Sequence, residues 1–233
     1  MSPGLTQVMS FYAAEPKIND PDIRSQRRLR QFALASGGFY AALWGLSAIF
    51  PGNDPLGFAL LIVAMSLGAH VVRPGWNLTP TLRRGHARRL IGLFALLVVG
   101  ATAAAVFLAK SGVRHPYQGM QIDLIAIMPP LLALTAIEEA IFRQIGYRWL
   151  EQGNATPRTV ALATAIAWAG GHLHGVLQTE YALFTLLQSV YLVGIGAILA
   201  EIRRVGAAWT LSWAGHFIYN IVTMRMLAQF ASP

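Results

Sequence analysis

The sequence predicts an all-α polytopic membrane protein, a bundle of about seven transmembrane helices, from three observations. Of the 233 residues, 55% are hydrophobic and only 12% are charged, whereas a soluble domain has about 25% charged residues. Apolar stretches of about 20 residues, long enough to cross a bilayer, recur along the chain. Basic residues gather in short segments between these stretches. That placement is typical of a membrane topology signal and argues against a nucleic-acid partner.

The amino-terminal part contributes a tail and three predicted spans. Residues 1–30, rich in proline, polar residues and arginine, are predicted to form a cytoplasmic tail with a short interfacial helix at 9–14. The first span, 31–50, ends at a Pro-Gly-Asn-Asp-Pro cluster that breaks regular structure. The next two spans, 56–72 and 90–109, flank an arginine-rich loop.

The carboxyl-terminal part contributes four more spans, so that residues 31–233 form a single transmembrane domain. The fourth span, 122–150, contains Pro129 and Pro130. These prolines are predicted to bend or interrupt the helix and so to open a water-accessible cavity. The remaining spans are 158–176, 181–202 and 207–230.

The basic residues predict the orientation. With the amino terminus inside, fourteen lysines and arginines fall on the inner side, and Lys110 and Arg114 fall on the outer side. This asymmetry predicts a cytoplasmic amino terminus, and the compact chain without long loops favours a bacterial inner (cytoplasmic) membrane. The inner group is Lys17, Arg24, Arg27, Arg28, Arg30, Arg73, Arg83, Arg84, Arg88, Arg89, Arg148, Arg158, Arg203 and Arg204.

Ionisable side chains inside the fourth span carry the functional prediction. Glu138, Glu139 and Arg143 lie within six residues of one another, although each charge costs about 2.5–3.5 kcal/mol in a membrane span. Glu139 and Arg143 are four residues apart and can pair on one helix face. Glu138 then faces the bundle centre, where a carboxylate can act as a general base toward water.

Later spans add polar residues of complementary chemistry. His172 follows small residues that allow close helix approach. It is favoured over His174, which points to nearly the opposite side of a helix. His216 and Asn220 share a helix face and suit hydrogen bonding to a developing oxyanion, although interhelical bonding for stability is the alternative.

Helical rise tests whether these groups can meet. At 1.5 Å per residue, Glu138 lies roughly 14 Å and His172 about 20 Å from the inner end of its span. His216 and Asn220 bracket about 14–20 Å. The polar groups therefore share one layer near the middle of the bilayer, which favours a single site.

Three motifs then stand in order within 136–220: Glu138-Glu139-x-x-x-Arg143, Trp168-x-x-x-His172 and His216-x-x-x-Asn220. As a set, they resemble the CPBP family of CAAX-processing and bacteriocin-processing intramembrane proteases, also called Abi proteins, which includes the Ras-converting endopeptidase. The family often has phenylalanine at the position of Trp168, so this chain keeps an aromatic residue there.

The resemblance implies an all-helical intramembrane fold and a glutamic-type endopeptidase. By this analogy Glu138 and His172 would activate water, while His216 and Asn220 would stabilise the oxyanion. The other two residues of the first motif, Glu139 and Arg143, would support them. The implied partner is a protein or peptide substrate with a processed tail, within membrane lipid.

Other functions stay open at this point. The predicted enzyme needs no cofactor; a zinc-dependent hydrolase is the lower-ranked alternative, because Glu and His bind zinc but no His-Glu-x-x-His motif occurs. The absence of cysteine excludes thiol catalysis and cysteine-ligated zinc. An ion- or proton-coupled transporter would also place charges inside the membrane. A non-catalytic scaffold or immunity protein is the third possibility.

Overall fold

The computed structural model describes residues 20–49, 54–71, 80, 86–116, 123–177 and 179–230. The interfacial helix predicted at 9–14 lies outside these residues. Within the described ranges every regular element is helical, which confirms the predicted fold class. The α-helices are α1 Pro21–Ile49, α2 Asp54–Val71, α3 His86–Lys110, α4 Leu124–Glu139, α5 Tyr147–Gln152, α6 Pro157–Gly171, α7 Ala182–Gly206 and α8 Trp209–Phe230.

Three shorter elements complete the described part of the chain. A π-helix, η2 (Ala140–Gly146), joins α4 to α5 without a break, so the described residues form seven long helical segments. The 3-10 turns η3 (His172–Leu177) and η4 (Thr179–Tyr181) connect α6 to α7. Among the described residues, three helices are long and apolar enough to cross a membrane, over His86–Leu108, Ile125–Gln152 and Ala182–Gly206.

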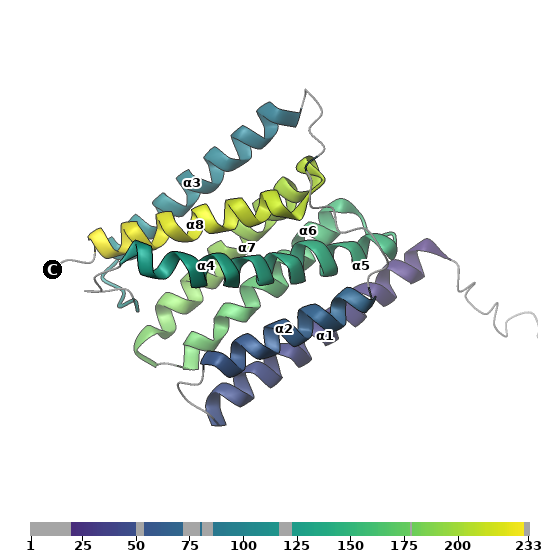
Figure 1. The fold of residues 1–233 in the computed structure, drawn as a ribbon, viewed down its shortest axis with the longest axis horizontal. Coiled ribbons are helices and arrows are strands. Elements are labelled where there is room, and N and C mark those ends of the chain that lie inside the picture. Colours follow the sequence, from purple (N-terminus) through teal and green to yellow (C-terminus); the bar gives the residue numbers. More distant parts are fainter. Residues whose placement is uncertain are drawn as a thin grey trace, which may run out of the picture.

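The helices form one bundle in which a different pair of helices lies along each side. Figure 1 shows α1 and α2 paired along one side, α3 with α8 along the other, and α4, α6 and α7 between them. The main apolar core lies where α3 and α8 pack against the central helices and includes Leu97, Phe142, Trp168, Leu199 and Tyr219. The polar groups predicted to meet are therefore carried by helices that surround this core.

Local signals explain where several helices begin. Asp123 precedes α4, and its carboxylate accepts from the backbone N–H groups of Ile125 and Ala126 at 2.9 and 3.3 Å. Thr156 caps α6 in the same way, and Pro157 follows at the first helical position. Such caps satisfy backbone donors that have no partner inside the helix.

The first helix starts at Pro21 and not at residue 31. Asp20 accepts from the backbone N–H of Asp22 at 2.9 Å, and its carbonyl accepts from that of Arg24 at 3.0 Å. A capping aspartate followed by proline is a strong start signal. The arginine run at 24–30 therefore lies within the first three turns of a helix.

The predicted interruption at Pro129 and Pro130 is wrong. Helix α4 continues through both prolines, which lie in its second turn, although neither has a backbone N–H to donate. The α-helical pattern changes later, at η2, directly after Glu139. A π-helix inserted into an α-helix often marks a functional site.

The fifth predicted span also ends differently. Helix α6 stops at Gly171, and His172 begins a 3-10 turn. Adjacent glycines weaken an α-helix because they add backbone freedom. The prediction that His172 and His174 face opposite sides of one α-helix is therefore wrong.

Candidate active site

Glu139 and Arg143 form a buried ion pair. Both side chains have no exposed surface, and Arg143 Nε lies 3.6 Å from Glu139 Oε2, which confirms the predicted pairing. Arg143 Nη2 also donates to the carbonyl oxygen of Gly196 at 3.2 Å. Its guanidinium lies 4.9 Å from the centre of the Trp168 ring. The arginine thus ties the π-helix to α6 and α7.

Glu138 has a different environment from its neighbour. Its side chain is 19% exposed, whereas that of Glu139 is fully buried. Its Oε2 atom accepts a hydrogen bond from Trp168 Nε1 at 2.8 Å. The same atom lies 3.9 Å from His216 Nε2. Of the two glutamates, Glu138 is therefore the one whose side chain keeps exposed surface.

His216 connects the two glutamates. The side chain is 1% exposed, and its Nδ1 atom lies 3.1 Å from Glu139 Oε1. Its Nε2 atom faces Glu138. The ring also packs edge-on against Trp168, with 4.9 Å between ring centres. The first and third motifs therefore meet through this histidine.

Trp168 lies at the centre of the cluster. It donates to Glu138, and its ring contacts His216, Arg143 and His172. The sequence prediction treated it only as the aromatic position of a motif. A buried indole N–H usually finds a hydrogen-bond acceptor. A tryptophan in an apolar span could therefore have been predicted to donate to one of the carboxylates in the neighbouring span.

The second motif approaches the cluster from the end of α6. The His172 ring is half-buried, its centre lies 5.2 Å from that of Trp168, and Nδ1 is 3.2 Å from the Trp168 carbonyl oxygen. The side chain of His174 lies outside the described part of the structure. Asn220 is half-buried on α8, one turn after His216.

Comparison with known proteins identifies this region. Residues 120–222 match the family model described as Type II CAAX prenyl endopeptidase Rce1-like. This region is thus similar to the Rce1-like family. The match contains all three motifs, so the predicted resemblance is confirmed, and it supports an endopeptidase in general terms. No curated protein and no solved structure matches the chain.

The Rce1-like region contains a further buried cation that the sequence prediction assigned only to the membrane topology. Arg203 is 6% exposed, and its Nε donates to the carbonyl oxygen of Arg143 at 3.0 Å. Its guanidinium lies 4.2 Å from the centre of the Tyr147 ring. A π-helix changes the regular pattern of backbone hydrogen bonds. Arg203 supplies a buried side-chain donor to one backbone carbonyl of η2.

Within the described ranges, no group of three or more histidine, aspartate or glutamate side chains is placed to hold a metal ion. Glu138, Glu139 and His216 are instead engaged with Trp168, with Arg143 and with one another. The Rce1-like cluster is thus a network of direct hydrogen bonds and ion pairs.

Proposed function

We propose that the chain is an intramembrane endopeptidase that hydrolyses a peptide bond in a protein or peptide tail with water activated by Glu138. One observation carries the proposal: Glu138 Oε2 is reached by Trp168 Nε1 at 2.8 Å and by His216 Nε2 at 3.9 Å. Residues from two other helices, α6 and α8, therefore converge on one accessible carboxylate of α4. This arrangement suits a general base better than a lock between helices.

Glu138 has the two properties that a general base needs, access to water and a fixed orientation. The bond from Trp168 holds Oε2, which leaves Oε1 for a water molecule. In the proposed reaction the water oxygen attacks the scissile carbonyl carbon while Glu138 takes a proton. The C–N bond then breaks, and the proton passes from Glu138 to the amine that leaves.

His216 is proposed to stabilise the oxyanion together with Asn220. Glu139 engages Nδ1 of the ring at 3.1 Å, which orients Nε2 toward Glu138. Nε2 donates to an oxyanion when the ring carries both protons. Preorganised donors of this kind are worth about 10²–10³ in rate.

The remaining motif residues are proposed to support this centre. His172 is half-buried beside Trp168, where it can help Glu138 to orient the water. Arg143 neutralises Glu139 and so keeps the carboxylate that orients His216 ionised without exposure to water. No resident cofactor is needed in this reaction, since the base and the oxyanion donors are all side chains.

The substrate and the membrane placement complete the proposal. The matched family is described as a CAAX prenyl endopeptidase, and we propose a carboxyl-terminal tail presented at the membrane. The excess of arginine and lysine at the inner ends of the predicted spans supports a cytoplasmic amino terminus. A bacterial inner membrane is the proposed location.

The first test uses the purified full chain in lipid nanodiscs and a panel of quenched fluorescent peptides, with and without a prenyl group. Glu138→Gln removes the proposed base but keeps its shape, so cleavage should fall by about 10²–10⁴-fold. Glu201→Gln is the matched control, because this glutamate pairs with Arg204 near the end of α7, away from the cluster. Equal cleavage by wild type and Glu138→Gln would rule out the proposed base.

A second test addresses the metal alternative and the natural substrate. Cleavage should persist in a strong chelator; loss of activity that zinc restores would favour a zinc hydrolase. A survey of peptide termini in source membranes, comparing wild type with Glu138→Gln at equal abundance, would identify the substrate. Flux of ions or protons that depends on Glu138, without any new termini, would favour a transporter.

A further inference from the structure

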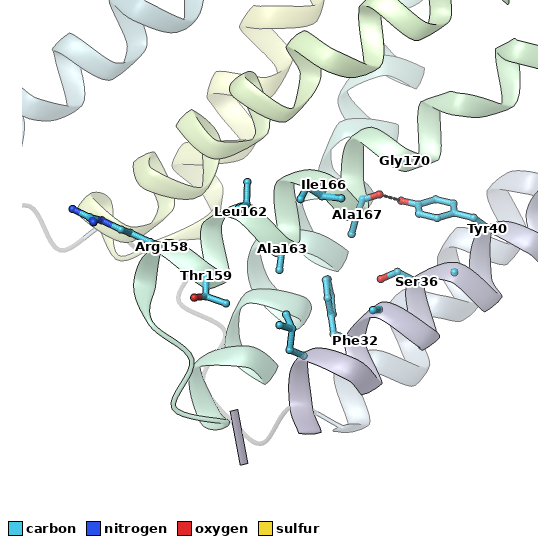
Figure 2. Close-up of a pocket in the computed structure, with 13 residues that line it drawn as sticks. Phe32, Ser36, Tyr40, Arg158, Thr159, Leu162, Ala163, Ile166, Ala167 and Gly170 are labelled. Atoms are coloured by element: carbon cyan, nitrogen blue, oxygen red, sulfur yellow. Dashed lines mark hydrogen bonds between the residues drawn. The ribbon is translucent and has the colours of Figure 1, made fainter. Parts of the chain in front are cut away.

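Helix α1 lies outside the family-matched region, yet one of its residues contacts the helix that carries the second motif. Tyr40 is a buried residue, 9% exposed, in the main core. Its hydroxyl donates to the carbonyl oxygen of Ala167 at 2.7 Å, a contact visible in Figure 2. Ala167 immediately precedes Trp168, which donates to Glu138. The Tyr40 contact is therefore made at the residue adjacent to Trp168.

The Tyr40 ring also fills space that a glycine leaves open. A Cβ atom added to Gly171 would lie 2.8 Å from Tyr40 Cε1, closer than such atoms pack. At Gly170 the nearest Tyr40 atom would be 3.9 Å away, an ordinary contact. The end of α6, directly before His172, is therefore shaped to receive this ring.

Much of the remaining α1–α6 interface is hollow. A cavity of about 590 Å³ separates the two helices, with Phe32 and Ser36 on one wall and Leu162 and Ile166 on the other. Tyr40 and Gly170 line one end of this space (Figure 2). Phe32 packs in an apolar cluster with Val160 of α6, whereas Tyr40 adds a directional hydrogen bond at the other end of the interface, directly before Trp168.

We infer that Tyr40 is a positioning residue that holds Ala167–Gly171 in place and thereby keeps the Trp168 indole against Glu138. The kinetic part of this inference rests on the proposed function. A change at Tyr40 acts on the orientation of the base and not on substrate contacts. It therefore lowers kcat and leaves KM unchanged.

The experiment reads the position of Trp168 directly. All six tryptophans are replaced biosynthetically by 5-fluorotryptophan in the full chain, and the Trp168 fluorine resonance is assigned by its loss in Trp168→Phe. Tyr40→Phe removes only the hydroxyl, and Gly171→Ala pushes on the ring. Two controls match them: Tyr147→Phe removes a buried hydroxyl on α5, and Gly170→Ala adds a methyl group without a clash.

The Trp168 resonance should shift in Tyr40→Phe and Gly171→Ala and stay in place in both controls. In Tyr40→Phe, kcat should fall by about two- to tenfold, the size expected for one lost hydrogen bond, with KM unchanged. An unmoved Trp168 resonance in folded Tyr40→Phe would overturn the inference, even if the melting temperature falls. If wild type cleaves no peptide, the proposed function fails, while the resonance still decides the role of Tyr40.

Discussion

Two glutamate–arginine clusters in this molecule contain the same kinds of ion pair but differ in how deeply their side chains are buried. Around Trp168, Glu139 and Arg143 are fully buried and 3.6 Å apart. Near the end of α7, Glu201 pairs with Arg204 at 2.6 Å and also with Arg89, but their side chains are 24%, 38% and 57% exposed.

The shorter contact is the weaker one in energetic terms. Solvent screens the exposed cluster, and such pairs contribute only about 0–1 kcal/mol. The buried pair has no water to replace a lost partner, and removing one member leaves an uncompensated charge that costs about 3–5 kcal/mol. Distance alone therefore ranks the two clusters in the wrong order, and exposure ranks them correctly.

The largest expected effect comes from breaking the buried pair on one side. Arg143→Met leaves the Glu139 charge without its partner and should lower the free energy of unfolding by about 3–5 kcal/mol. Unfolding in mixed micelles with increasing denaturing detergent measures this loss. The double variant Arg143→Met/Glu139→Gln removes both charges and should recover most of it. A double variant as unstable as the single one would show that charge is not the cause.

Arg203→Met tests the buried donor beside the pair. This change deprives the Arg143 carbonyl of a charged donor at 3.0 Å, and hydrogen bonds to charged groups are worth about 1.5–3 kcal/mol. The same unfolding assay should show a loss in that range. A loss below 0.5 kcal/mol, about the effect expected at Arg204, would mean that Arg203 behaves like the exposed cluster.

Gly196→Ala tests the close packing that lets Arg143 reach α7. The new methyl group would lie 2.9 Å from Ala165 Cβ and 3.1 Å from Arg143 Nη2. Overpacking of this kind costs about 1–3 kcal/mol. Gly194→Ala on the same helix is the control, since nothing lies within 4 Å of its added Cβ. Equal stability of the two variants would show that the close contact at Gly196 relaxes without cost.

The smallest effect is expected in the exposed cluster. Arg204→Gln removes two hydrogen bonds to Glu201, both 2.6 Å long. Because both side chains contact solvent, the free energy of unfolding should change by less than about 0.5 kcal/mol. A larger loss at low salt that disappears at high salt would show that long-range charge interactions contribute there.

Part of the site was predictable because it depends on one helix. The pairing of Glu139 with Arg143 follows from four-residue spacing, and the structure contains it. The common depth of Glu138 and His216 follows from helical rise, and the two side chains do meet. The direct contacts of Asn220, predicted from its spacing to His216, remain a prediction.

The sequence by itself determined the helical class, most helix positions and the three motifs, because apolar length, capping residues and local spacing act within a few residues. The tertiary structure decided which glutamate stays exposed, that Trp168 donates to it, and that Tyr40 and Arg203 donate to the carbonyl oxygens of Ala167 and Arg143. These contacts join residues 30, 60 and 127 positions apart in sequence. They depend on how each helix is rotated and how closely its neighbours approach, and no local pattern encodes that.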